Sequence, residues 1–378
     1  MNQRTFIILF FLGLLLAGCK EDVQEKVEIS EKPLKLPARL AYEQQFSEND
    51  STFIRWKEAF QKAKHDNLQI TLPYSESGVY TEDELNVYSY NIQLKEGERI
   101  VVDLQKQVDS SLVFIDIFEV KKDSLRLLKS AEEFESMFSK EIEESGLYKL
   151  ILQPQLNMKG SFQLKIYSEP LYPFPVVDGV NKDIQGFWAD PRDTGSRSHE
   201  GVDIFAERGT PVIAITDGTI SSTGNGGFGG LQVWITDKLK KKRIYYAHLD
   251  SFIVSEGDKV KIGDTIGFVG NTGNAIELPP HLHFGVYKEQ GAVNPISFIK
   301  KTEIQTIDQP SIVNRAVVKR HIAEVRKGPA SIFPQLSVLR KNDTISVLGK
   351  SQEWFHIQSS KGLKGYVYER EVTPLSSN

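Results

Sequence analysis

The stretch that decides the fold runs through three pieces of sequence: Ser198-His199-Glu200-Gly201-Val202-Asp203, Tyr245-Tyr246-Ala247-His248-Leu249 and His281-Leu282-His283-Phe284. Together they hold four of the chain's seven histidines and one aspartate. Gly201 lies inside the first piece, and apolar residues suited to strands follow it. This pattern favours an extended conformation over a helix.

In an extended chain, side chains two or four residues apart point to the same face. His199 is therefore expected to share a face with Asp203. His281 shares one with His283, while Leu282, Phe284 and Val286 point to a core on the other side. By the same count, Tyr246 shares a face with His248.

The residue types in these pieces are those of a metal site. Imidazole nitrogens and a carboxylate oxygen bind zinc, and a catalytic zinc keeps three protein ligands and one open position. Four histidines and one aspartate are more than such a site needs. The surplus imidazoles are available for proton transfer or for stabilising an oxyanion.

A family resemblance rests on four motifs in this order: Gly195-Ser196-Arg197-Ser198-His199-Glu200-Gly201-Val202-Asp203-Ile204, Gly209-Thr210-Pro211-Val212, Tyr246-Ala247-His248-Leu249 and His281-Leu282-His283-Phe284. This combination resembles the lysostaphin-type (LytM-like) zinc metallopeptidases, which cut peptide cross-bridges in bacterial cell walls. The resemblance covers residues 186–300. It implies a central antiparallel β peptidase domain of the LytM, duplicated-hybrid-motif type at residues 180–300, with Zn²⁺ as cofactor and peptidoglycan as substrate.

Carried over by position, the resemblance implies that the zinc ligands are His199, Asp203 and His283. It implies that His281 is the general base or oxyanion partner, and that His248 is the second catalytic histidine. On this basis the chain is expected to be a zinc metalloendopeptidase that remodels the cell wall. An inactive relative, which keeps the fold as a scaffold, binds wall peptide and activates another hydrolase, is the alternative.

The substrate side of the site is less defined. Tyr246, on the face expected for His248, is a candidate substrate-binding residue. Gly285 stands where the family often has an acid, and Glu277-Leu278-Pro279-Pro280 replaces a shorter family loop. Both departures bear on substrate preference. The bond that is cut stays open between a D-alanine–diamino acid link and a glycine bridge, and a lipoprotein favours the first.

The N-terminus has the pattern of a lipoprotein signal peptide at residues 1–19. Arg4 precedes the apolar run Phe6–Ala17, which is too short to span a bilayer comfortably. The run ends in Leu16-Ala17-Gly18-Cys19, which resembles a bacterial lipoprotein cleavage site with Cys19 as the lipidated residue. Lys20 follows, which implies anchoring in the outer membrane of a Gram-negative bacterium. Residues 20–38 are rich in Lys and Glu and are predicted to be a solvated tether.

The amino-acid composition argues against several classes of function and of site. Apolar content of 40% and charged content of 25% are ordinary for folded soluble modules. A net charge of −4 gives no basic footprint for nucleic acid. Cys19 is the chain's single cysteine, which excludes an internal disulfide and a multi-cysteine zinc site. Regulatory envelope proteins stay open as a further class of partner.

The chain is expected to be mainly β, with accessory modules on both sides of the peptidase domain. Residues 39–168 are predicted to form a helix, within residues 47–66, followed by a jelly-roll-like β-sandwich. The alternation of Val87–Leu94 carries this prediction, because Tyr88, Tyr90, Ile92 and Leu94 share a face. Prolines at 170, 173 and 175 mark the boundary to the peptidase domain.

Two weaker signals complete the picture. Gly224-Asn225-Gly226-Gly227-Phe228-Gly229 matches a dinucleotide motif by letter, but a strand pattern follows it where a helix is needed, so a hairpin loop is predicted. Residues 314–376 resemble bacterial Src-homology-3-like domains, a small β-barrel. Within this stretch His356 alternates with Phe355 and Ile357, which places it on a strand surface, and neither it nor His321 is expected to bind zinc.

Overall fold

The structure is a computed structural model that describes residues 36–82, 85–122, 124–302 and 313–375. The predicted signal peptide with Cys19, and all but the last residues of the predicted tether, lie outside the described residues. Within the described ranges, no helix is both long enough and apolar enough to cross a membrane.

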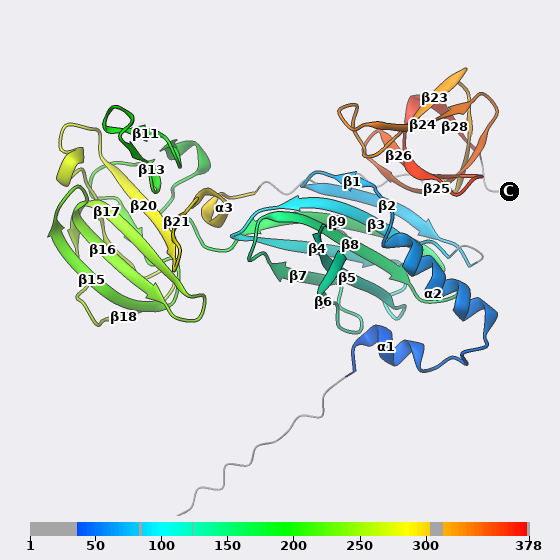
Figure 1. Cartoon of the computed structure of the whole chain (residues 1–378), viewed down its shortest axis with the longest axis horizontal. Helices are drawn as coiled ribbons and strands as arrows, with labels where there is room; N and C mark the ends of the chain where they lie inside the picture. Colours follow the sequence, from blue (N-terminus) through cyan, green and yellow to red (C-terminus); the bar gives the residue numbers. More distant parts are fainter. Residues whose placement is uncertain (1–35, 83–84, 123, 303–312, 376–378) are drawn as a thin grey trace, which may run out of the picture. The chain divides into compact units, whose positions relative to one another are not determined.

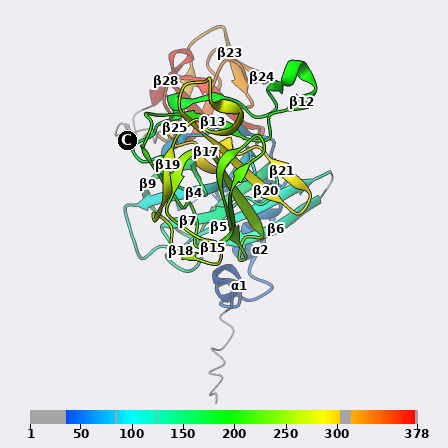
Figure 2. The ribbon, with the colours of Figure 1, turned by 90° about the vertical axis from the view of Figure 1, so that its left-hand side faces the viewer.

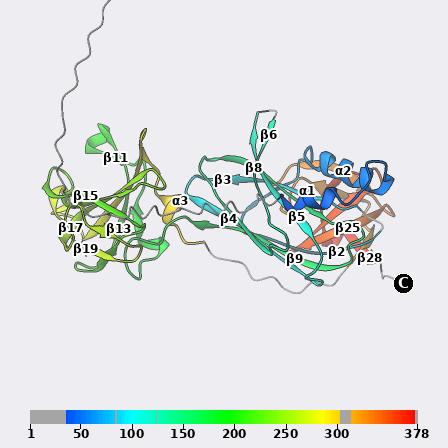
Figure 3. The ribbon, with the colours of Figure 1, turned by 90° about the horizontal axis from the view of Figure 1, so that it is seen from below.

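Two helices begin the described chain, α1 (Ala38–Glu43) and α2 (Ser51–Ala63). The Asp50 side chain caps α2 by accepting hydrogen bonds from the first-turn backbone N–H groups of Thr52 and Phe53. Phe53 and Trp56 are buried against Phe114 of the adjacent sheet. The helix predicted within residues 47–66 is therefore confirmed as α2, and it covers one face of that sheet (Figures 1 and 3).

The following strands form two layers. One layer has the order β1-β3-β8-β5-β6 and the other contains the run β2-β9-β4-β7. Their bounds are β1 Gln69–Ile70, β2 Tyr74–Tyr80, β3 Tyr88–Leu94, β4 Glu98–Lys106, β5 Val113–Lys121, β6 Ser124–Ser130, β7 Met137–Glu141, β8 Gly146–Pro154 and β9 Gly160–Pro170.

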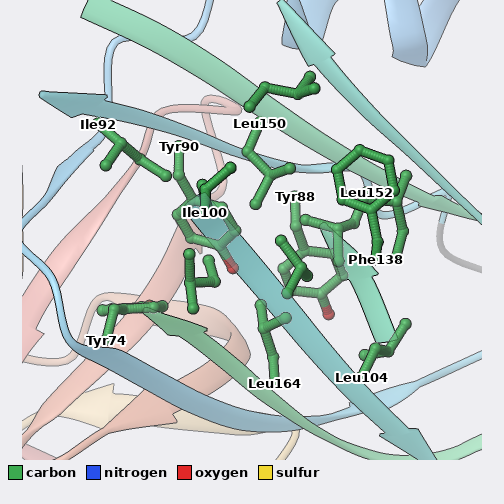
Figure 4. Close-up of a cluster of buried hydrophobic side chains, with 14 of the residues drawn as sticks. Tyr74, Tyr88, Tyr90, Ile92, Ile100, Leu104, Phe138, Leu150, Leu152 and Leu164 are labelled. Carbon is green, nitrogen blue, oxygen red and sulfur yellow. The ribbon is translucent and has the colours of Figure 1, made fainter. Parts of the chain in front are cut away.

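One apolar core joins the two layers. The alternating residues of β3, namely Tyr88, Tyr90, Ile92 and Leu94, point into it as predicted. Side chains of β4, β7 and β9 meet them from the opposite layer, among them Ile100, Phe138 and Leu164 (Figure 4). Burial of this apolar surface is the main force that holds the two layers together.

The central domain, predicted above to be a peptidase domain, is built on one sheet of ten strands, whose main path has the order β10-β13-β20-β17-β16-β15-β18. The strands are β10 Ile184–Gly186, β13 Val202–Phe205, β14 Pro211–Ile213, β15 Gly218–Gly226, β16 Gly230–Asp237, β17 Lys242–Phe252, β18 Lys259–Val260, β19 Thr265–Val269, β20 His281–Lys288 and β21 Gly291–Val293. All their pairings are antiparallel, and β17 lies beside β20 (Figure 2).

Alternation along β20 positions the site. Leu282, Phe284 and Val286 are fully buried in the domain's core, so His281 and His283 point to the other face, as predicted. The glycine-rich stretch 224–229 belongs to the β15–β16 hairpin, in which Gly226 pairs with Gly230. The hairpin prediction is confirmed. A short helix, α3 (Ile296–Ile299), follows the sheet.

The C-terminal strands form a small unit around their own core. They are β22 Arg315–Val318, β23 Ile322–Arg326, β24 Gln335–Arg340, β25 Thr344–Ser351, β26 Trp354–Ser359, β27 Lys364–Tyr368 and β28 Val372–Leu375. β25 also pairs with β2, at Ser77 and Lys350.

The prediction for His356 is wrong. Its side chain is fully buried and donates a hydrogen bond from Nδ1 to Glu76 Oε1 at 2.8 Å. Alternation along β26 predicts a surface position only where the second face of the strand meets water. Here that face is covered by the residues of β2 around Glu76, so His356 is a buried partner of a carboxylate.

Candidate active site

Three candidate ligands come together where β13 pairs with β20. Asp203 lies directly across from His283 in this pair, and His199 lies just before β13. His199 Nε2 is 2.9 Å from His283 Nδ1 and 3.1 Å from Asp203 Oδ1, and His283 Nδ1 is 3.1 Å from the same oxygen. One ligand atom of each residue therefore faces a common point. Two imidazole nitrogens and a carboxylate oxygen in this arrangement fit one divalent cation with an open position.

The backbone holds the far nitrogen of His199. Its Nδ1 lies 2.8 Å from the carbonyl oxygen of Phe187. A carbonyl only accepts hydrogen bonds, so Nδ1 carries the proton and Nε2 presents its lone pair to the ligand group. His199 also exchanges backbone hydrogen bonds with Ala189 and Asp190, at 3.0 and 2.9 Å. The turn that follows β10 thus sets both the tautomer and the orientation of this ligand.

Two glycines make room for the ligands. Gly186 pairs with Asp203 across β10 and β13, and a Cβ atom on Gly186 would collide with the Asp203 carboxylate. A Cβ atom on Gly201 would lie 2.7 Å from Cε1 of the His283 ring. Side chains at either position would displace a ligand, which is a physical reason for glycine there.

The charge states suit a metal. Burial on its own raises the pKa of Asp203, but its close contacts with His199 and His283 hold that pKa well below its ordinary value. Burial lowers the pKa of His283. The carboxylate is therefore ionised and the imidazole neutral near neutral pH, which are the forms that bind a cation.

Two further histidines face the same groove from neighbouring strands. The ring centroids of His248 and His281 are 5.0 Å apart. His281 Nδ1 lies 2.8 Å from the Pro279 carbonyl oxygen, and His248 Nδ1 lies 2.9 Å from that of Thr272. Each ring therefore carries its proton on Nδ1 and leaves Nε2 as a proton acceptor.

His248 has an unusual backbone. Its φ is 60°, a value that residues other than glycine rarely adopt, and its N–H donates to the Gly229 carbonyl at 2.8 Å. Burial, together with the neighbouring His283 and His281, lowers the pKa of His248 to about 4. The ring is therefore neutral near neutral pH.

The prediction that Tyr246 lines the site is wrong. Tyr246 is fully buried in the core, where its hydroxyl accepts a hydrogen bond from the Ile215 N–H at 3.1 Å. The reason is a shift in the pairing of β16 with β17, between Leu231 and Val233, which places an extra residue in β17 between Tyr246 and Leu249. This bulge breaks the alternation, so Tyr245 and not Tyr246 shares the groove with His248.

The groove has a volume of about 260 Å³. Besides the five predicted polar residues, its lining includes Arg192, Arg197, Phe228, Tyr245, Leu278 and Tyr287. Phe228 comes from the glycine-rich hairpin, and the Arg197 guanidinium lies 4.6 Å from the centre of its ring. The hairpin thus contributes a wall of the groove.

Several of these contributors were missed from the sequence. Phe187, Thr272 and Pro279 act through backbone carbonyls, which no side-chain pattern reveals. Tyr245 was hidden by the bulge. Arg192 carried no signal, because it lies before the matched motifs and is one of many charged residues.

Comparison with known proteins agrees with this geometry. Residues 197–295 match the model of Peptidase family M23, and residues 323–373 match the bacterial SH3 domain. This chain carries an M23 peptidase domain. The match to the M23 family starts after β10 and Arg192, so this preceding segment lies outside it.

Three curated relatives are similar to this part of the chain. An L-Ala–D-Glu endopeptidase of Bacillus subtilis is 37% identical over 126 residues, which are 31% of this chain and 38% of the relative. A glycyl-glycine endopeptidase of Staphylococcus capitis is 31% identical over 182 residues, 42% of this chain and 50% of the relative. A DD-carboxypeptidase/endopeptidase of Neisseria meningitidis is 42% identical over 101 residues, 27% of this chain and 23% of the relative. The chain thus spans half or less of the length of each.

Proposed function

We propose that this chain is a cell-envelope zinc metalloendopeptidase that hydrolyses peptide cross-links of peptidoglycan. The observation that carries the proposal is the convergence of the ligand atoms of His199, Asp203 and His283 beside His248 and His281. The names of the three relatives, all endopeptidases, support the same class of reaction.

The donor set suits zinc. His199 Nε2, His283 Nδ1 and Asp203 Oδ1 would hold the ion, because two neutral imidazoles and one carboxylate form a common catalytic zinc set with an open position. When bound, zinc lowers the pKa of water to roughly 7 and polarises a carbonyl group.

His281 is the proposed general base. The ring proton of His281 sits on Nδ1, which donates a hydrogen bond to the Pro279 carbonyl oxygen. Nε2 is therefore unprotonated and can accept a proton from the attacking water. The resulting imidazolium then delivers this proton to the leaving amine. His248 Nε2 is an unprotonated acceptor for the same reason. It becomes a hydrogen-bond donor to the oxyanion only when it, in place of His281, takes up the proton of the water and then passes it to the leaving amine.

The identity of the bond that is cut is a separate part of the proposal. The three relatives are named for an L-Ala–D-Glu bond, a glycyl-glycine bond and a DD bond, so similarity alone does not choose among them. We propose the D-alanine–diamino acid cross-link as the substrate, since the predicted lipoprotein signal favours an envelope without glycine bridges.

A scaffold that binds wall peptide without turnover remains the alternative. All three ligand residues and both groove histidines are present, with the tautomers that proton transfer needs. A scaffold requires none of these features, so the arrangement favours catalysis.

The test is digestion of cross-linked peptidoglycan by the purified protein without residues 1–19, with and without a chelator. Mass spectrometry of the products should show cross-linked dimers converted to monomers, and the chelator should prevent this. The mass of the new termini identifies the bond. Stoichiometric bound zinc without any cleavage would favour the scaffold.

We propose further that Cys19 is lipidated and anchors the protein in the outer membrane. The support is the sequence Leu16-Ala17-Gly18-Cys19 after an apolar run, with Lys20 behind it. Labelled palmitate should be incorporated into the wild type and not into Cys19→Ala. Equal labelling of both would contradict the anchor.

A further inference from the structure

An arginine lies behind the ligand group, on the short strand β11 (Pro191–Arg192). Its Nη2 is 2.5 Å from Asp203 Oδ2, and the Asp203 side chain is only 11% exposed. The same nitrogen is 3.0 Å from His199 Nδ1. That ring nitrogen already donates to Phe187, so the charge-assisted hydrogen bond of Arg192 goes to the carboxylate.

The atoms that Arg192 contacts differ from those that form the ligand group. The ligand group uses Asp203 Oδ1 and His199 Nε2, whereas Arg192 lies beside Asp203 Oδ2 and His199 Nδ1. The arginine therefore does not stand in for the cation. It occupies the opposite side of both residues, and its contacts are compatible with a bound metal.

The backbone around Arg192 fixes its place. Arg192 pairs with Arg197 of β12 (Arg197–Ser198), and Pro191 pairs with Ser198. The next residue along the chain, His199, is bonded back to Asp190. The hairpin thus joins Arg192 to the ligand His199 through a few backbone hydrogen bonds, which fix the backbone position of the arginine beside the ligand group.

We propose that Arg192 is a positioning residue of the metal centre: it holds Oδ2 of Asp203 so that Oδ1 points at the cation. This inference rests on the proposed zinc site. Partners of this kind commonly change metal affinity by about 10- to 100-fold. A carboxylate without such a partner can rotate about its Cβ–Cγ bond, so that its ligand oxygen no longer points at the cation.

The positive charge has an opposite effect, because a guanidinium near the centre repels a divalent cation. If repulsion dominated, removal of Arg192 would tighten zinc binding. The short contact to a mostly buried carboxylate argues that orientation dominates. The two effects predict opposite signs, which makes the proposal testable.

The experiment measures the zinc affinity of the full chain by competition with a chromophoric chelator, for wild type, Arg192→Ala, Arg192→Gln and Arg192→Lys. We expect Arg192→Ala to weaken zinc binding about 10- to 100-fold. Arg192→Lys should recover part of the loss, because it keeps a charged donor. The visible spectrum of bound Co²⁺ should change in Arg192→Ala, since it reports the geometry of the ligands.

Arg197→Ala is the matched control, since Arg197 lies across from Arg192 in the same hairpin and stacks over Phe228. Its zinc affinity should stay at the wild-type value. A denaturation curve of each metal-free variant shows whether that variant is folded. If Arg192→Ala is not folded, Arg192→Gln takes its place in the comparison. Unchanged or tighter zinc binding in the folded Arg192 variants would overturn the proposal and leave the proposed function standing. A wild type that binds no zinc would overturn both.

Discussion

In the part of the chain that the structure describes, two buried clusters pair a carboxylate with histidine, and one of these two opens onto a groove. In the M23 domain, Asp203 Oδ1 lies 3.1 Å from both His199 Nε2 and His283 Nδ1. Next to β25 and β26, Glu76 Oε1 accepts a hydrogen bond from His356 Nδ1 at 2.8 Å. The residue types are similar, but the surroundings differ.

The Glu76 cluster is closed. Its second carboxylate oxygen accepts hydrogen bonds from Tyr74 and, at 2.6 Å, from Tyr90. The side chains of Glu76 and His356 are both fully buried. Ligand types alone therefore do not make a metal site. What distinguishes the M23 cluster is that three ligand atoms face one point beside an open groove, whereas each oxygen of Glu76 is used by a fixed protein donor.

The largest expected effect is on turnover. His281→Ala should lower the cleavage rate about 100- to 10,000-fold, which is the usual contribution of a positioned general base. Zinc should stay bound, because His281 is not one of the three ligands. Cleavage assays and metal analysis of the same samples test this. Normal turnover by the zinc-loaded variant would sink the role of His281.

The Glu76 cluster should affect the stability of the fold and not zinc binding. Glu76→Gln should lower the free energy of unfolding by about 1.5–3 kcal/mol, because the hydrogen bonds from Tyr90 and His356 lose their buried carboxylate acceptor. Zinc affinity should not change. Chemical denaturation measures the first and chelator competition the second. Glu353→Gln, at an exposed carboxylate, is the control and should stay within about 0.5 kcal/mol of wild type.

The groove beside the Asp203 cluster should make stability depend on pH, through His248. The pKa of His248 is lowered to about 4, against an ordinary value of 6.5. Between these values the unfolded chain binds a proton that the folded chain does not, so stability falls as the pH drops through this window. The loss attributed to His248 is at most about 3 kcal/mol. Denaturation of the metal-free protein from pH 7 to pH 4 measures it, and His248→Gln should flatten the dependence.

A smaller effect is expected from the glycines beside the ligands. Gly201→Ala places a Cβ atom 2.7 Å from the His283 ring and should weaken zinc binding about 10-fold or more. Gly224→Ala is the control, because no heavy atom lies within 4 Å of its added Cβ. Equal zinc affinity in both variants would show that the ligand cluster tolerates the added methyl group.

The sequence predicted what regular alternation determines. His281 and His283 share a face because β20 is regular, and the strand predicted at 87–94 appears as β3. It failed where alternation is broken or where a second layer covers a strand. The bulge in β17 exchanges Tyr246 for Tyr245, and contact with Glu76 buries His356. Contributions of backbone carbonyls, such as those of Phe187 and Thr272, and of Arg192 arise only from the folded arrangement.

The most direct test of this comparison measures zinc content and peptidoglycan cleavage on the same preparations of wild type, His283→Ala and His356→Gln. We predict stoichiometric zinc and cleavage in the wild type and in folded His356→Gln. We predict loss of both in His283→Ala. Zinc and cleavage that persist in His283→Ala would contradict the assignment of the metal centre to the open cluster.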